Sequence, residues 1–153
     1  MSPEERGRPD AVVRVVARLL LGPSIVLAAA LIAKGYAEVG DGFGAGVIVA
    51  LAVALTYVAL GGTDAEEAVP MLRHGPKVAV GGLLLALTSG FFPLLLGERP
   101  ITHYPGPGDE VVKVGALELF TPILLDIGVF LLVVGVLVTL LHHLAHADDE
   151  VEP

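Results

Sequence analysis

Cysteine and tryptophan are absent from this 153-residue chain, and aromatic residues make up only 5% of it. The lack of cysteine excludes disulfide bonds, iron–sulfur ligation and thiolate zinc sites. Charged residues are also scarce, at 17%, against about 25% in an ordinary soluble domain. The formal net charge of −8 comes mostly from the ends and loops, and no basic cluster indicates a nucleic-acid partner.

Hydrophobic residues reach 54% of the chain, supplied mainly by leucine, valine, alanine and glycine. A soluble domain of this length leaves much of its surface in water and could not bury so much aliphatic surface. The apolar residues also gather in four long runs, each with about the 20 residues that a helix needs to cross a bilayer. We therefore predict an all-α membrane protein, an integral bundle of four transmembrane helices without a separate soluble domain.

The predicted spans cover residues 15–34, 43–60, 78–97 and 119–141. Residues 1–10 and 147–153 are expected to be flexible tails, and residues 98–118 a Pro/Gly-rich loop outside the membrane. Lysine and arginine favour the cytoplasmic side of membrane proteins. With both termini in the cytoplasm, six of these residues lie inside (Arg6, Arg8, Arg14, Arg18, Arg73 and Lys77) and three outside (Lys34, Arg99 and Lys113). The predicted orientation is therefore N-in and C-in.

A glycine-rich stretch opens the second run, directly after a polar turn that contains Lys34, Glu38 and Asp41. Its four glycines occupy alternate positions, Gly40, Gly42, Gly44 and Gly46. Gly42 and Gly46 form a small-xxx-small pair, which lets another backbone approach closely, and Gly128 with Gly135 suits tight packing in the fourth span. The alternating glycines also permit a non-helical, re-entrant start, which is tolerated where the backbone is buried in protein or lines a cavity. Their spacing does not fit a dinucleotide fingerprint.

Asp126 is the single ionisable residue within the fourth predicted span. A carboxylate at the centre of a membrane helix costs roughly 2.5–3.5 kcal/mol of insertion free energy, and Asp126 lies about 10 Å into the span. It indicates either a protonatable or cation-binding site, or a structural carboxylate that hydrogen-bonds a neighbouring helix. Pro122 would leave the carbonyl of Glu118 without its helical donor. That carbonyl, the Glu118 carboxylate and the Thr121 hydroxyl are hard ligands that suit Na⁺, while a structural kink would account for the same proline.

Three histidines follow the fourth span, at positions 142, 143 and 146. His142 and His146 are four residues apart, but they stand at a helix end before an acidic tail. This position favours a solvated interfacial cluster over a metal site, and we expect no metal and no cofactor. No Ser/His/Asp constellation, nucleotide loop or haem-ligand pair is evident, so the chain is not expected to be an enzyme.

Two separated segments carry a more specific pattern. In the first, a G-H-N-x-P-G-G-G-F signature followed by a long apolar helix is matched at Gly35, Gly40, Gly42, Phe43 and Gly46. Tyr36, Ala37, Val39 and Asp41 stand where that signature usually has His, Asn, Pro and Gly. In the second, a T-P-x-L-F-D-I-G-V pattern is matched at Thr121, Pro122, Asp126, Gly128 and Val129. Together these segments resemble the MnhB (MrpB) component of the multisubunit Mrp (Mnh) Na⁺/H⁺ antiporters.

The resemblance implies a multipass component of a hetero-oligomeric complex in the cytoplasmic membrane that exchanges Na⁺ for H⁺. Larger subunits related to respiratory complex I are thought to carry the main proton channels, with the MnhB component packed beside them, near the proposed sodium route. The implied partners are the other antiporter subunits, the lipid bilayer, and Na⁺ and H⁺ as transported ions. The departures at Tyr36, Ala37 and Val39 remove polar groups from the turn.

Two alternatives to this function remain open on the sequence. The same module could serve a membrane-bound hydrogenase or another redox-driven ion pump, or the chain could be a purely structural assembly subunit. For the antiporter we predict an ion pathway at Asp126, Glu118 and Thr121. Residues predicted for helix packing or the family motif are Gly35, Gly40, Gly42, Phe43, Gly44, Gly46, Pro122, Gly128 and Gly135.

Overall fold

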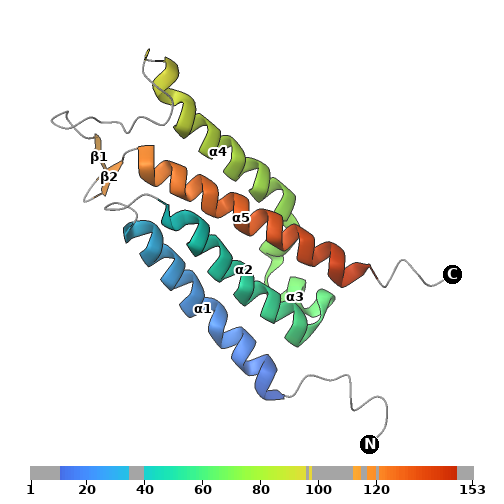
Figure 1. The fold of residues 1–153 in the computed structure, drawn as a ribbon. Coiled ribbons are helices and arrows are strands. Elements are labelled where there is room, and N and C mark those ends of the chain that lie inside the picture. Colours follow the sequence, from blue (N-terminus) through green and yellow to red (C-terminus); the bar gives the residue numbers. More distant parts are fainter. Residues whose placement is uncertain are drawn as a thin grey trace, which may run out of the picture.

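The computed structural model describes residues 11–34, 40–95, 97, 112–114, 117–119 and 121–147. Its elements, in chain order, are α1 (Ala11–Lys34), α2 (Asp41–Leu60), α3 (Gly62–Ala68), η2 (Pro70–His74), α4 (Gly75–Leu95), β1 (Val112–Val114), β2 (Leu117–Leu119) and α5 (Thr121–His146) (Figure 1). Among the described residues, four helical segments are long and apolar enough to cross a membrane. The predicted all-α class with four membrane helices is confirmed, while the N-in/C-in orientation stays a prediction.

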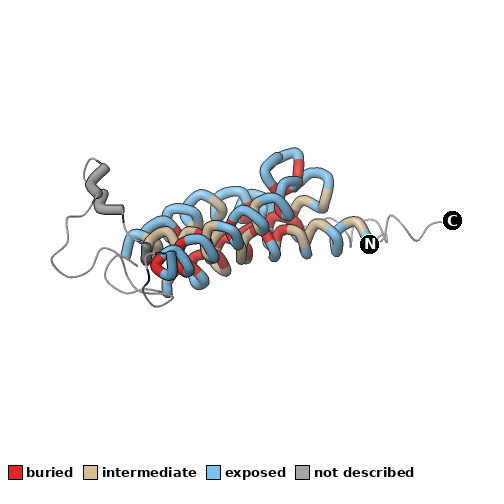
Figure 2. The backbone as a smooth tube through the Cα atoms, turned by 90° about the horizontal axis from the view of Figure 1, so that it is seen from above, coloured by how far each residue is buried: buried red, intermediate tan, exposed pale blue. Residues whose placement is uncertain are grey.

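The four long helices lie side by side in one row, in the order α1, α2, α5, α4 (Figure 1). α2 packs along α1 on one side and along α5 on the other, and α4 packs along α5. Viewed from above, the molecule is flat, and exposed residues run along the long helices (Figure 2). The fold is therefore an open layer, and many of its apolar side chains must contact lipid tails or other subunits.

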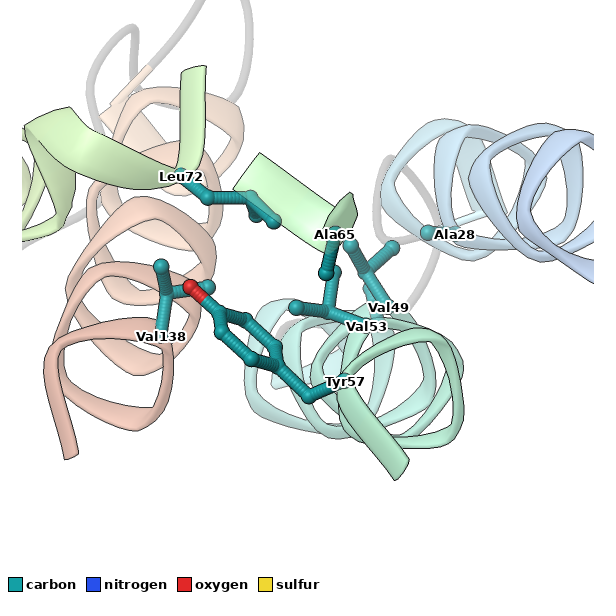
Figure 3. Close-up of a cluster of buried hydrophobic side chains, with 8 residues drawn as sticks. Ala28, Val49, Val53, Tyr57, Ala65, Leu72 and Val138 are labelled. Carbon is teal, nitrogen blue, oxygen red and sulfur yellow. The ribbon is translucent and has the colours of Figure 1, made fainter. Parts of the chain in front are cut away.

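The connection from α2 to α4 crosses over α5, because α4 lies on the far side of α5 from α2. The short helices α3 and η2 make this crossing and contact α5 on the way. Gly61 allows the sharp turn out of α2, since its φ of 85° lies in the left-handed region that favours glycine. Beneath the crossing, α1, α2, α3, η2 and α5 share a buried cluster that includes Ala28, Val49, Val53, Tyr57, Ala65, Leu72 and Val138 (Figure 3).

α5 begins at Thr121, two residues later than the predicted fourth span. Leu119 instead belongs to β2, which pairs antiparallel with β1 so that Val112 lies opposite Leu119 and Lys113 opposite Glu118. Residues 112–114, 117 and 118 of the predicted 98–118 loop thus belong to two paired strands. Pro122 is the second residue of α5, where its missing N–H is harmless because the first helical N–H groups have no partner within the helix. The kink predicted for Pro122, and a Glu118 carbonyl freed by it, are therefore wrong.

The glycine-rich stretch is helical from Asp41 onwards, so the re-entrant start that its spacing permits is not adopted. α1 starts at Ala11 and α4 at Gly75, each a few residues before the predicted spans. The predicted tail 1–10, residues 148–153 of the predicted tail 147–153, and the predicted motif residue Gly35 lie outside the described residues. The helices thus extend past the apolar runs at several ends.

Candidate functional site

Asp126 connects the fourth membrane helix to the start of the second. The residue is buried, with 2% of its surface exposed. Its Oδ1 and Oδ2 atoms accept the backbone N–H of Gly40, at 3.2 and 3.3 Å. Gly40 directly precedes α2, where N–H groups lack helical partners and the helix dipole favours a negative charge. The φ of 120° at Gly40 favours glycine at this turn.

Beside this hydrogen bond, α2 and α5 pack so closely that their backbones are nearly in contact. A Cβ atom on Gly42 would overlap the backbone carbonyl of Asp126, and one on Gly46 would lie 2.8 Å from the Cβ of Val133. The small-xxx-small pair of α2, Gly42 and Gly46, therefore packs against α5 of the same chain. Gly44, by contrast, has nothing within 4 Å of its Cβ position, and Phe43 is 61% exposed. These two residues make no comparable contact with α5.

The other side of α5 has a second glycine-lined contact, with α4. A Cβ atom on Gly128 would lie 2.6 Å from the backbone nitrogen of Ala86, and one on Gly135 would overlap the backbone of Ala79. From the opposite helix, a Cβ atom on Gly82 would lie 2.7 Å from the carbonyl oxygen of Gly128. The close contact of α5 with α2 thus depends on glycines of α2, and its close contact with α4 depends on glycines of both α4 and α5.

The three predicted ion-pathway residues belong to one continuous part of the chain. Glu118 is in β2, Thr121 is the first residue of α5, and Asp126 follows five residues later, about 7.5 Å further along the helix axis. The end of α1 is close to the start of α2, because Lys34 Nζ forms an ion pair with Asp41 Oδ2 at 3.6 Å. Asp126 is the one of the three for which the structure describes a side-chain contact. That contact is the hydrogen bond between its buried carboxylate and the backbone N–H of Gly40 at the start of α2.

A second polar cluster surrounds Glu66 at the opposite end of the layer. Glu66 belongs to α3 and is 5% exposed. Its Oε1 atom accepts the hydroxyl of Tyr57 at 3.3 Å and lies 2.5 Å from Nδ1 of His142. Its Oε2 atom accepts Nε–H of Arg73 at 3.3 Å, and Nδ1 of His146 is 3.9 Å from Oε1. One buried carboxylate therefore joins α2, α3, η2 and α5.

The charge of Glu66 is maintained by these neighbours. Burial raises the pKa of its carboxyl, but the hydrogen bond with His142, the charges of His142 and His146 and the Tyr57 hydroxyl outweigh burial, so that the pKa lies below its usual value. Glu66 is thus an anion at neutral pH.

The sequence predicted a solvated histidine cluster, and the structure adds Glu66 as a partner for two of the three residues. His143 is exposed and its Nδ1 lies 2.8 Å from the carbonyl oxygen of Thr139. His142 and His146 instead turn toward Glu66, with 39% and 35% of their side chains exposed. Sequence reasoning missed Glu66 because it stands 76 residues from His142, in a polar segment read as a loop. The available signal was the helix-favouring run 62–68.

The fold and these two polar clusters define a multi-pass membrane protein whose buried ionisable groups lie near the helix ends. Residues 12–139 match the family model described as a domain related to the MnhB subunit of Na⁺/H⁺ antiporter. The match extends from α1 into the last turns of α5 and includes all four long helices. The chain belongs to this family.

Three relatives fit that assignment. The chain is 31% identical over 135 residues to the Na(+)/H(+) antiporter B subunit of Alkalihalophilus pseudofirmus, covering 88% of this chain and 89% of that protein. It is 26% identical over 144 residues to the Na(+)/H(+) antiporter B subunit of Bacillus subtilis, covering 94% and 99%. It is also 33% identical over 132 residues to a probable K(+)/H(+) antiporter A/B subunit of Rhizobium meliloti, covering 86% of this chain but 13% of that longer protein.

Proposed function

We propose that this chain is the MnhB-type component of an Mrp-type multisubunit antiporter that exchanges a monovalent cation for protons across the cell membrane. The observation that carries the proposal is the family match over residues 12–139, because it includes every membrane helix rather than one motif. The two relatives named as Na(+)/H(+) antiporter B subunits are also of similar length, since the matched regions cover 89% and 99% of them. The chain acts as a transport component rather than as an enzyme.

The flat architecture supports a role beside other subunits. A single row of four helices exposes large apolar side chains on its outer helices, such as Val26 on α1 and Leu84 on α4, at 70% and 59%. In a bilayer such side chains contact lipid or neighbouring helices, and close packing between subunits adds van der Waals contacts. The Rhizobium relative, whose name joins A and B, contains a region similar to this chain within one long polypeptide. We propose that an A-type subunit packs against this row of four helices in the complex.

Na⁺ is the proposed cation, because the two relatives of similar length carry Na(+)/H(+) in their names. Within the chain, the proposed point of contact with the ion pathway is Asp126, preceded along the chain by Thr121 and Glu118. Ionisable residues inside membrane segments are costly and commonly mark ion or proton routes. Asp126 is such a residue, and it is buried at a junction of two helices.

The test is cation/proton exchange by the whole complex with and without this chain. The complete set of antiporter genes, or the set lacking this one, is expressed in cells without other Na⁺/H⁺ antiporters. Everted vesicles are energised, and the collapse of the pH gradient on adding Na⁺, and separately K⁺, is followed with a fluorescent probe. Exchange is expected only with the complete set and with Na⁺. Equal exchange without the chain would contradict the proposal, as would copurification with hydrogenase subunits.

A further inference from the structure

Glu66, His142 and His146 together have the composition of a transition-metal site. The two histidines stand one turn apart on α5, with ring centroids 4.6 Å apart, and Glu66 faces them from α3. Each residue offers one ligand atom, and these atoms all lie within 4.8 Å of one another. Two imidazoles and one carboxylate are a ligand set that zinc uses when it keeps a fourth position open.

Hydrogen bonds orient the ligands as metal sites require. Nδ1 of His146 lies 2.8 Å from the carbonyl oxygen of His142, and because a carbonyl only accepts, Nδ1 carries the proton. Nε2 of a neutral His146 then keeps its lone pair. On Glu66, Arg73 is bonded to Oε2, so that Oε1 is directed toward the histidines. A ring N–H on a backbone carbonyl and a hydrogen-bonded ligand carboxylate are the outer contacts typical of metal sites.

We propose that Glu66, His142 and His146 bind a divalent transition-metal ion of the zinc type. Zn²⁺ would take the place of the hydrogen atom between His142 Nδ1 and Glu66 Oε1, with His142 bound as the neutral imidazole whose proton is on Nε2. The imidazole nitrogens select Zn²⁺ over Na⁺, Mg²⁺ and Ca²⁺, which prefer oxygen ligands. The half-exposed rings leave water access to the fourth position.

The geometry requires small side-chain movements only. Zinc bonds of about 2.0 Å in a tetrahedral site place ligand atoms roughly 3.3 Å apart. The present separations, between 2.5 Å and 4.8 Å, lie on both sides of that value, and rotations of the half-exposed imidazoles can adjust them. Arg73 is the neighbouring positive charge that opposes a cation. It sits on the far oxygen of Glu66, and 60% of its side chain is exposed, which lowers the repulsion.

The proposed site goes beyond antiport and does not depend on it. It would fasten α3, which crosses over the layer, to the last turns of α5, two segments that are 76 residues apart in the chain. Along α5 it is 16 residues or more from Asp126, about 24 Å. Zinc binding there and ion exchange at the other end are therefore separable by experiment.

The experiment measures Zn²⁺ binding to the full-length chain, purified with its copurifying membrane partners through a tag without histidine. After treatment with EDTA and removal of the chelator, the protein is titrated with Zn²⁺ against a coloured zinc indicator. Co²⁺ is used in parallel, because its visible absorption reports tetrahedral coordination. We expect one tight equivalent of Zn²⁺ per chain and a higher thermal midpoint with Zn²⁺ than without.

The matched variants are His142→Gln, His146→Gln and His143→Gln. The first two should weaken binding by at least about tenfold to a hundredfold, and the third should bind like the wild type, because His143 is exposed and outside the group. Equal affinity in His146→Gln and wild type would overturn the proposal, as would an equal loss in His143→Gln. His146 makes no hydrogen bond to Glu66 at 3.9 Å, so its variant remains decisive if His142→Gln fails to fold.

Discussion

The carboxylate of Asp126 accepts the backbone N–H of Gly40, across 86 residues of sequence, and joins the glycine-rich segment before α2 to the first turns of α5. One member is buried near the start of α5, and the other is the turn residue before α2. The contact satisfies a backbone donor that has no partner within α2 and places a carboxylate at the positive end of a helix dipole. It gives Asp126 a structural role that exists whether or not an ion also passes there.

Asp126→Asn separates these two roles. Asparagine keeps an oxygen that can accept the Gly40 N–H but has no titratable charge. We expect the complex to assemble with near wild-type thermal stability, while Na⁺/H⁺ exchange in everted vesicles falls by about tenfold or more, in line with the loss of a positioned acid–base group. Asp126→Ala is the comparison, and it should also lose about 1–2 kcal/mol of stability with the hydrogen bond to the Gly40 N–H. Wild-type exchange in Asp126→Asn, with an unchanged pH profile, would remove Asp126 from the pathway.

Gly42→Ala should weaken the contact between α2 and α5. Its new methyl group would overlap the backbone carbonyl of Asp126, and backbone cannot yield as a flexible side chain can. Overpacking of this kind costs about 1–3 kcal/mol. The loss can be measured as a lower thermal midpoint in detergent and a lower yield of assembled complex.

Gly44→Ala is the matched control two residues away in the same helix. No atom lies within 4 Å of its Cβ position inside this chain, so the change should be neutral or stabilise the helix by up to about 1 kcal/mol. Stability of Gly42→Ala equal to that of Gly44→Ala would contradict the close approach of α2 and α5.

Neighbouring glycines in α4 offer a second matched pair. A methyl group at Gly82 would overlap the backbone of α5 near Leu132, whereas one at Gly81 meets nothing within 4 Å. Gly82→Ala is expected to destabilise the protein by about 1–3 kcal/mol, and Gly81→Ala should not. Thermal unfolding of both purified variants checks this. A loss confined to Gly81→Ala would mean that α4 uses its other face to contact a partner in the complex.

The orientation can be tested directly because the chain has no cysteine of its own. Single cysteines at Asp64, exposed in α3, and at Lys113 in β1 should lie on opposite sides of the membrane. With both termini in the cytoplasm, a membrane-impermeant maleimide added to intact cells should label position 113 and spare position 64. Everted vesicles should give the reverse. Labelling of position 64 in intact cells would contradict the predicted topology and indicate the opposite orientation.

The amino-acid sequence was enough to predict a four-span membrane protein of the MnhB-related family. Uncharged runs of about 20 residues have few other solutions, because a backbone in a bilayer must satisfy its own hydrogen bonds. The glycine-rich start of the second span and the T-P-x-L-x-D-I-G pattern were visible without coordinates. So was the presence of Asp126 within an apolar run, but two explanations for it remained open.

The contacts that these residues make became known from the three-dimensional fold. Uniformly apolar helices carry little information about their neighbours, since the choice depends on how small residues let two backbones meet. The order α1, α2, α5, α4, the contact of Asp126 with Gly40 and the meeting of Glu66 with His142 all join residues far apart in sequence. The start of α5 at Thr121 could not be predicted either. In the sequence, Pro122 is compatible both with a kink inside a helix and with the first turn of one, and the structure distinguishes the two by placing Leu117–Leu119 in a strand.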